Sequence, residues 1–285
     1  MQKIKIIKRY IRSLFRLSKE EEFQETYAEI LEGTQFKGYN LWILGFAMII
    51  ACIGLNTDSI SAVIGAMLIS PLMGPIVALA FGMSINDRYL KEQGIKNWLL
   101  MTLVSLMASV LYFLISPFNS NTNALLSFQK ASIFDILLAF FGGMAGFIGI
   151  IKKEGTKVIA GVAVATACMP PLCTAGYGIA HLDYFYFVGG LYFYLINSLF
   201  IGLATFLTAR IAGYNQKTNI EVPQKTVLWL WYIFITLMIL PSLYIAFIKW
   251  KEQHTIDKKV STEQMRIEEL ERKVHELDSL VRLKK

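Results

Sequence analysis

The chain has 285 residues, of which 55% are hydrophobic and 17% are charged, and its formal net charge is +7. This composition excludes an ordinary soluble domain and indicates a polytopic membrane protein. The sequence contains no Gly-rich phosphate loop, no His-Glu-x-x-His motif and no metal-ligand spacing around its cysteines. We therefore expect no enzyme, no cofactor and no metal, although an intramembrane enzyme built from scattered polar residues stays open.

Residues 1–38 form the predicted N-terminal arm, on the cytoplasmic side. Between residues 3 and 19, apolar positions recur at helical spacing among basic ones, which predicts an amphipathic helix on the anionic lipids of the inner leaflet. The apolar positions are Ile4, Ile7, Ile11, Leu14 and Phe15. From Glu20 to Glu32 the arm turns acidic. Because no apolar core precedes residue 39, we expect no cleaved secretory signal.

Seven apolar stretches have the length, roughly 17 to 25 residues, that a bilayer core requires. They lie at residues 39–55, 59–84, 98–116, 131–151, 157–181, 184–209 and 226–249. The predicted fold class is therefore an all-α polytopic membrane protein with about seven transmembrane helices. We group the spans as a first three-span unit at 39–116, a second at 131–209 and a separate seventh span at 226–249.

The distribution of lysine and arginine predicts the orientation, because cytoplasmic loops carry the positive excess. The arm holds eight of them and the loops at 85–97, 152–157 and 210–225 hold three each, whereas the alternate loops hold none, one and none. We therefore expect a cytoplasmic N-terminus. Seven spans place the C-terminal tail outside, although residues 249–285 carry ten of the 28 basic residues. The same rule explains most of the net positive charge, so we expect no nucleic-acid partner.

Two spans carry prolines where a membrane helix should be continuous. The first contains Ser70-Pro71-Leu72-Met73-Gly74-Pro75, and the second contains Met169-Pro170-Pro171-Leu172. Proline removes a backbone donor and clashes with the carbonyl four residues earlier, so we expect both helices to break within the bilayer. Broken helices at matching places in two halves of a chain indicate a transporter binding site. The alternative is that these prolines kink packed helices without lining a site.

The order of plain, broken and plain spans in both units predicts an internal repeat. A shift of one hundred residues pairs Pro71 with Pro171 and Leu72 with Leu172. Because each unit has three spans, the second unit would be inserted upside down relative to the first, which gives an inverted-topology repeat.

The run Ile64-Gly65-Ala66-Met67-Leu68-Ile69-Ser70-Pro71-Leu72-Met73-Gly74-Pro75 and the second segment, Gly161-Val162-Ala163-Val164-Ala165 with Met169-Pro170-Pro171-Leu172, resemble a known family. It is the prokaryotic membrane family of domain of unknown function number 389. The resemblance covers about residues 40 to 210. It implies a multi-pass protein of a bacterial or archaeal plasma (inner) membrane, and it brings no substrate, cofactor or catalytic residue.

If the breaks form a site, freed amides at a half-helix N-terminus favour an anion and freed carbonyls at a C-terminus favour a cation. No charged residue lies mid-span in either broken segment, so a small polar solute, an anion and a weakly held cation all stay open. The candidate substrate-binding residues surround the two breaks and are small, hydroxylic or proline: Gly65, Ser70, Pro71, Gly74, Pro75, Thr166, Pro170, Pro171, Thr174 and Tyr177.

Two acidic residues beside the spans are candidate ion or proton sites, because a charge is costly in lipid. Asp58 precedes the second span, where the alternative is a cap of the helix that follows it. Asp135 lies about one turn inside the fourth span, where the alternative is an interface residue near the lipid headgroups.

The tail at 250–285 carries a heptad pattern across residues 256–284. Val260, Ile267, Val274 and Val281 fall on a positions, with Leu270 and Leu277 on d. Beta-branched residues at a with leucine at d favour a parallel dimer, so we expect a homodimer or a higher homo-oligomer through a coiled coil. The alternative is a single amphipathic helix on the membrane or on the protein itself.

Two functions follow from these patterns. The first is a secondary transporter or permease for an unidentified small polar or ionic solute, with its site at the two broken helices. The alternative is a non-transporting dimeric membrane scaffold or sensor. Transport predicts that Pro71→Ala or Pro171→Ala abolishes activity, whereas the scaffold predicts that loss of the tail heptads does so.

Overall fold

The computed structural model describes residues 20–34, 38–117, 122–152 and 157–214, together with the single residues 232, 236 and 264. The chain divides into two units, Met1–Met238 and Ile239–Lys285, and every helix described below belongs to the first. The predicted basic helix at 3–19 lies outside the described residues. So do the seventh span and the coiled coil, apart from the three single residues.

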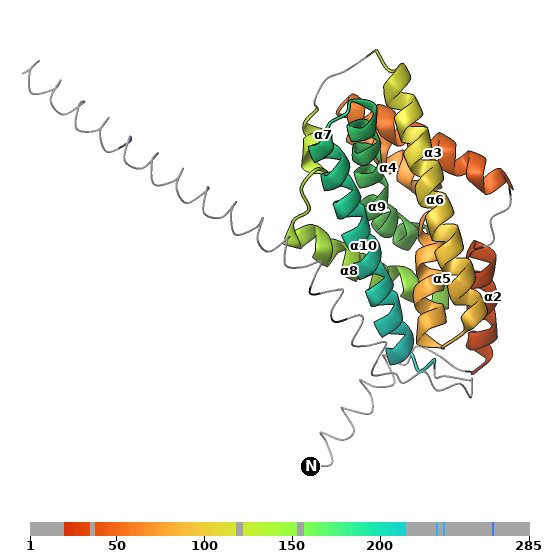
Figure 1. Cartoon of the computed structure of the whole chain (residues 1–285). Helices are drawn as coiled ribbons and strands as arrows, with labels where there is room; N and C mark the ends of the chain where they lie inside the picture. Colours follow the sequence, from red (N-terminus) through yellow and green to blue (C-terminus); the bar gives the residue numbers. More distant parts are fainter. Residues whose placement is uncertain are drawn as a thin grey trace, which may run out of the picture. The chain divides into compact units, whose positions relative to one another are not determined.

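The first half of the described chain contains five helices (Figure 1). They are α2 (Glu20–Thr34), α3 (Gly38–Asn56), α4 (Ile60–Ile69), α5 (Met73–Ser84) and α6 (Arg88–Ile115). The helices α3, α5 and α6 are rich in apolar residues, and α3 and α5 each pack on α6. Helix α2 instead alternates glutamates with a few aromatic and aliphatic side chains.

The second half contains one short helix and three long ones. They are α7 (Asn123–Ser127), α8 (Ile133–Lys152), α9 (Lys157–Ala180) and α10 (Tyr184–Ile211). Helix α9 is the most enclosed of these in its C-terminal half, because every described side chain from Cys168 to Gly178 is buried. It packs on α3, α4, α6, α8 and α10.

The prediction of an all-α protein with several membrane-length helices is confirmed over the described residues. Four helices there are long and apolar enough to cross a membrane: α3, α6, α8 and α10. The pair α4 and α5 makes a fifth if it is counted as one span, and the two helices are bent by 53° at the break between them. The count of seven spans stays a prediction, since the seventh lies outside the described part.

The first predicted break is confirmed and has a local cause. Ser70 precedes Pro71 and is extended, with φ −73° and ψ 129°, as expected because the proline ring disfavours the helical region for the residue before it. Helix α4 therefore ends at Ile69. Pro75 lies in the first turn of α5. A residue there has no intrahelical acceptor for its backbone N–H, so a proline costs the helix no hydrogen bond.

The second predicted break is wrong, because α9 is a continuous helix that contains Pro170 and Pro171. The two prolines cannot donate to the carbonyls four residues earlier, those of Thr166 and Ala167. The packing of α9 on its neighbouring helices holds it in one piece despite this loss. Tertiary packing thus overrides the local signal in the second half.

The bundle has two ends, which we name the α2 end and the α7 end. At the α2 end, a buried apolar cluster joins α2, the α5–α6 turn and the last turns of α8 and α10. Its members are Ile30, Val77, Ala78, Phe81, Ile85, Leu90, Phe147, Ile151, Ala209, Ala212 and Tyr214. The described residues at or beside the three loops that we predict to be cytoplasmic, Ile85, Leu90, Ile151, Ala212 and Tyr214, thus share this end.

At the α7 end, the last turns of α3 and α6 meet α7 and the α9–α10 turn. Thr122 donates to the carbonyl oxygen of Leu55 at 2.6 Å, and Asn56 donates to the hydroxyl of Ser116 at 3.0 Å. The ring of Phe113 packs edge-on against Tyr177, with centroids 5.1 Å apart. Helix α6 therefore runs from the α2 end to the α7 end, and α10 runs back (Figure 1).

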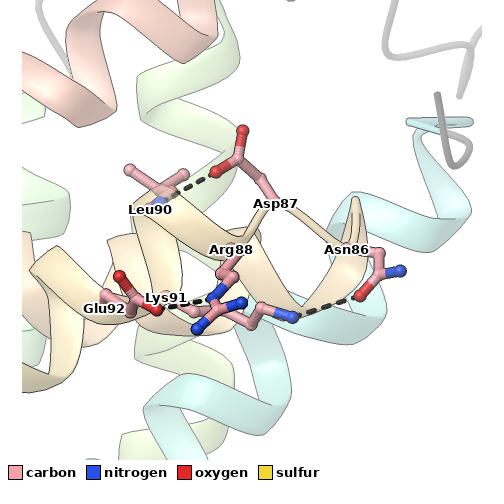
Figure 2. A network of polar contacts seen from close by, with 6 residues as sticks. All are labelled: Asn86, Asp87, Arg88, Leu90, Lys91 and Glu92. Atoms are coloured by element: carbon pink, nitrogen blue, oxygen red, sulfur yellow. Dashed lines mark hydrogen bonds and ion pairs between the residues drawn. The ribbon is translucent and has the colours of Figure 1, made fainter. Parts of the chain in front are cut away.

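The α5–α6 and α9–α10 hairpins share one turn geometry. In the first, Asp87 donates its backbone N–H to the carbonyl of Gly82 at 2.8 Å, after a left-handed Asn86 with φ 57°. In the second, Asp183 donates to the carbonyl of Gly178, also at 2.8 Å, after a left-handed Leu182 with φ 55°. Each aspartate then caps the helix that follows, as Figure 2 shows for Asp87 and Leu90.

The two hairpins also share their closest contact between helices. A Cβ on Gly94 of α6 would lie 2.6 Å from the backbone nitrogen of Leu79 in α5. A Cβ on Gly190 of α10 would lie 2.6 Å from the backbone nitrogen of Ala175 in α9. A similar turn joins α3 to α4, so the turn alone does not single out the two hairpins. The two hairpins are singled out by the combination of this turn with the glycine contact between their helices.

The shared features of the two hairpins lie 96 positions apart, from Gly82 to Gly178 and from Gly94 to Gly190, whereas the predicted repeat uses a shift of one hundred. The offset of 96 residues pairs Pro75 with Pro171. The shift of one hundred pairs Pro171 with Pro71 instead. The repeat itself stays a prediction.

Candidate functional site

A pocket of about 740 Å³ lies at the first break. Pro71, Gly74 and Val77 contribute one wall from the break and α5, and α2 contributes the opposite wall. The remaining lining residues come from the start of α3 and the end of α8: Tyr39, Asn40 and Ile150. The pocket is therefore built around the break that the sequence predicts.

The C-terminal turn of α2 rests directly on the break. The carbonyl oxygen of Gly33 lies where a Cβ on Gly74 would be, so only glycine at residue 74 allows this approach. The carbonyl of the next residue, Thr34, accepts a hydrogen bond of 2.6 Å from the buried amide of Asn97 in α6. Helix α2 is thus anchored to both α5 and α6 beside the pocket.

The N-terminal half of α2 is tied to the α2 end of the bundle. Phe23 packs on Phe81 and on Tyr214, with ring centroids 6.2 and 5.6 Å apart. Thr26 shares a buried hydrogen bond of 3.2 Å with the hydroxyl of Tyr214. Part of the predicted arm is therefore a packed element of the bundle.

A further bond links α2 to the α5–α6 turn. The hydroxyl of Tyr27 donates to Asp87 Oδ2 at 3.1 Å. Partial burial raises the pKa of Tyr27, and the hydrogen bond to the Asp87 carboxylate raises it further. The same carboxylate accepts the backbone N–H of Leu90, so Asp87 joins α2 to the first turn of α6.

The walls of the pocket differ in chemistry. Helix α2 supplies three carboxylates, those of Glu25, Glu29 and Glu32. The opposite wall is the start of α5, whose N-cap residue Leu72 makes no side-chain capping bond. The backbone N–H of Gly74 donates to the carbonyl of Pro71 at 3.4 Å and Pro75 has no N–H, so these two residues offer no free amide to the pocket. Carboxylates favour a cation or a hydrogen-bond donor, and a helix start favours an acceptor. A small solute with both kinds of group suits such a pocket.

The other predicted residues of the first break surround this pocket without all lining it. Pro75 is buried in the first turn of α5. The hydroxyl of Ser70 is buried and has no hydrogen-bond partner among the described residues. Gly65 of α4 has no atom within 4 Å of its would-be Cβ, so it contributes no close packing contact there.

The predicted residues of the second break lie in α9, away from the pocket lining. Pro170, Pro171, Thr174 and Tyr177 are buried. The hydroxyl of Thr174 donates to the carbonyl of Pro170 at 3.1 Å, and the ring of Tyr177 stacks on His181 at 4.2 Å. The side chain of Thr166 lies outside the described residues.

The two acidic candidates have capping roles in the structure. Asp58 is exposed and left-handed, and its Oδ1 accepts the backbone N–H of Ala124 at 2.8 Å. It therefore caps α7, 66 residues away in the chain, rather than the helix that follows it. Asp135 Oδ2 accepts from both the backbone N–H and the hydroxyl of Ser132, at 2.8 and 2.7 Å, which forms a cap at the start of α8.

Buried polar groups between the helices were missed from the sequence. Cys52 donates to Ser109, whose hydroxyl in turn donates to the carbonyl of Cys173 at 3.0 Å, so that α3, α6 and α9 are joined. Thr102 of α6 shares a 2.6 Å hydrogen bond with Tyr194 of α10. These residues are isolated polar positions in apolar helices, so the sequence does not predict their hydrogen bonds. The sole indication is that the small polar residues of α6 recur at helical spacing.

The role of α2 was also missed. Its apolar residues Phe23, Tyr27, Ile30 and Leu31 recur at helical spacing, which is the signal that a packed helix would give. The glutamates between them predict only a change of charge along a surface arm. No pattern in the sequence identifies the helices on which the apolar face of α2 packs.

Fold and site together define an all-helical protein with several apolar, membrane-length helices and a pocket at a broken one. Residues 67–203 match the family described as Domain of unknown function (DUF389), which confirms the resemblance expected from the sequence. A protein of Methanocaldococcus jannaschii described as uncharacterized is 24% identical over 204 residues. That match covers 70% of this chain and 63% of the relative's length. No solved structure matches the chain.

Proposed function

We propose that this protein is a secondary transporter or permease for a small polar or ionic solute, with its site at the break between α4 and α5. The pocket of about 740 Å³ beside Pro71 and Gly74 is the observation that carries the proposal. Backbone that leaves a helix at membrane depth is tolerated where it is buried or lines a cavity. The α4–α5 pair has both the bend and the cavity.

The paired hairpins support the architecture that such transporters use. The α5–α6 and α9–α10 hairpins share a turn and a glycine contact, and they run in opposite directions through the bundle. An inverted-topology repeat of two three-span units accounts for both facts. The first unit is α3 to α6, with the bent α4–α5 pair counted as one span, and the second is α8 to α10. Sites in these proteins lie where the two repeats meet.

The orientation follows from where the basic loops gather. The segments with the most lysine and arginine begin or end at the α2 end, so we assign this end to the cytoplasm of a prokaryotic inner membrane. The pocket then faces the cytoplasm beside α2. Its carboxylates and the start of α5 favour a solute with both donor and acceptor groups.

Transport by the purified protein in liposomes tests the proposal. Charged solutes are screened by solid-supported membrane currents, and neutral solutes by stopped-flow light scattering, with alkali cations, inorganic anions and amino acids as the panel. We expect at least one solute to give a signal above that of empty liposomes. Gly74→Leu should abolish this signal, because the new side chain enters the space held by Gly33 and the pocket.

Gly45→Leu is the matched control, since the same change is made on α3 where nothing lies within 4 Å of a Cβ. It should keep the signal. A panel that gives no signal, or a signal that survives in both variants, contradicts the proposal. A non-transporting scaffold predicts the first of these results.

A further inference from the structure

The offset of 96 residues places the break of the first half on an intact part of α9. Ser70 corresponds to Thr166, Pro71 to Ala167, and Leu72 to Cys168. In the first half the chain leaves the helix at these positions, between Ile69 and Met73. In the second half the same positions are helical. The two halves therefore hold the same segment in two different conformations.

Prolines stand at equivalent positions, Pro75 and Pro171, in the two halves. Pro171 cannot donate to the carbonyl of Ala167, whereas the equivalent carbonyl, that of Pro71, accepts the backbone N–H of Gly74 at 3.4 Å. Pro170 removes the donor for the carbonyl of Thr166 as well. Helix α9 thus lacks two consecutive backbone hydrogen bonds at the place where its counterpart is open.

Packing on α9 just after this place keeps the segment closed. Gly190 of α10 lies against the carbonyl oxygen of Pro171, where a Cβ would be 2.6 Å away. Cys168 is buried and lies 3.6 Å from the hydroxyl of Ser198, also in α10. The first half has a proline at residue 71 where the second has Ala167, so Ser70 directly precedes a proline and its counterpart Thr166 does not.

We infer that α9 opens at residues 166–168 in a second state of the protein, and that the pocket then faces the α7 end. The inference rests on the proposed inverted repeat, in which two halves exchange conformations when the site changes sides. Helix α9 runs from the α2 end to the α7 end, opposite to the α4–α5 pair, so its opening creates the equivalent pocket on the opposite side.

The native cysteines provide the test. One variant keeps Cys168 (Cys52→Ala, Cys173→Ala) and a second keeps Cys173 (Cys52→Ala, Cys168→Ala), and both residues are buried in this structure. The full chain in liposomes is labelled from each side with a membrane-impermeant maleimide. We expect Cys168 to react from the α7 side, and at least about tenfold faster than Cys173, which lies beyond the missing hydrogen bonds.

Pro171→Ala in the variant that keeps Cys168 returns the donor for the carbonyl of Ala167. We expect the labelling of Cys168 to slow by about tenfold, as one regained backbone hydrogen bond allows. Gly45→Ala in the same background, on α3 where a Cβ meets nothing within 4 Å, should leave the rate of Cys168 unchanged. The slow rate of Cys173 should also be unchanged by Pro171→Ala, which shows that the fold is intact.

Equal rates for the two cysteines overturn the inference. So does a Cys168 rate that Pro171→Ala leaves unchanged, or labelling of Cys168 from the α2 side alone. Labelling needs no solute, so the result is independent of the transport assay. A protein that transports while Cys168 stays unreactive contradicts the second state and leaves the proposed function standing.

Discussion

Gly82 and Gly178 occupy the same place in two turns that lie at opposite ends of the bundle. A Cβ on Gly82 would lie 2.9 Å from the backbone nitrogen of Lys91, and a Cβ on Gly178 would meet that of Phe187. In both turns the fourth residue of the helix that follows, nine positions after the glycine, therefore lies against that glycine. The two turns thus share their backbone contacts, and the α3–α4 turn makes the same contact between Gly54 and Val63.

The first prediction concerns the helix contacts of the two hairpins. Gly94→Ala and Gly190→Ala should each destabilise the protein by about 1–3 kcal/mol, because the new methyl group meets a neighbouring helix backbone that cannot move aside freely. Thermal unfolding in detergent measures the loss. The two variants should behave alike, since their contacts are equivalent.

Gly45→Ala is the control for this pair, because a Cβ there meets nothing within 4 Å. It should be neutral or stabilise α3 by up to about 1 kcal/mol, the usual gain of alanine over glycine in a helix. If all three variants lose stability equally, the close contacts of Gly94 and Gly190 are not the cause.

A second prediction compares the two capping aspartates. Asp87→Ala and Asp183→Ala should each cost about 0.5–2 kcal/mol through the lost helix cap. Asp87→Ala should cost more, because it also removes the acceptor of Tyr27. A double-mutant cycle of Tyr27→Phe with Asp87→Ala should show coupling, and the same cycle with Asp183→Ala should show none. Coupling of equal size in both cycles would refute the link between α2 and the turn.

The third prediction is a pH dependence from Tyr27. Its pKa is raised in the folded protein, so the folded state favours the protonated hydroxyl. The resulting stability is fully present below the ordinary tyrosine pKa of about 10 and is lost as the pH rises through the higher folded value. Between about pH 9 and pH 11 the melting temperature of the wild type should fall more than that of Tyr27→Phe. Parallel curves would show that the hydrogen bond to Asp87 does not hold α2 in place.

A fourth prediction tests the docking of α2 on the break. Gly74→Ala places a methyl group on the carbonyl oxygen of Gly33, so α2 must shift. Hydrogen exchange of residues 20–34 should rise at least tenfold, as expected when a packed element opens locally. Gly65→Ala in the same span meets nothing within 4 Å and should leave this exchange unchanged.

The break at Ser70 was predictable and the continuity of α9 was not, for a physical reason. A residue before proline avoids the helical region through a clash within its own dipeptide, so the sequence around Pro71 contains the cause. Pro170 and Pro171 have the same local effect. Whether the helix yields depends on the packing of Gly190 and its neighbours against them, which lies in other parts of the chain.

The pocket was predictable only in part. Pro71 and Gly74 were expected to line a site, and both do. The opposite wall, with Glu25, Glu29 and Glu32, comes from a segment whose contacts depend on Gly33 reaching Gly74. A helix with one apolar face can pack on a membrane or on a protein, and its own sequence does not distinguish the two.

The most direct test of the central claim is the water accessibility of the two proline segments. Single cysteines are placed through residues 66–76 and 166–176 of a variant without Cys52, Cys168 and Cys173, and they are labelled from each side with a water-soluble maleimide. Our account predicts labelling around Ser70, Pro71 and Gly74 from the α2 side, and labelling at 166–168 from the α7 side. If both segments stay unlabelled from either side, the prolines belong to a dry packed core, and the scaffold or sensor function replaces transport.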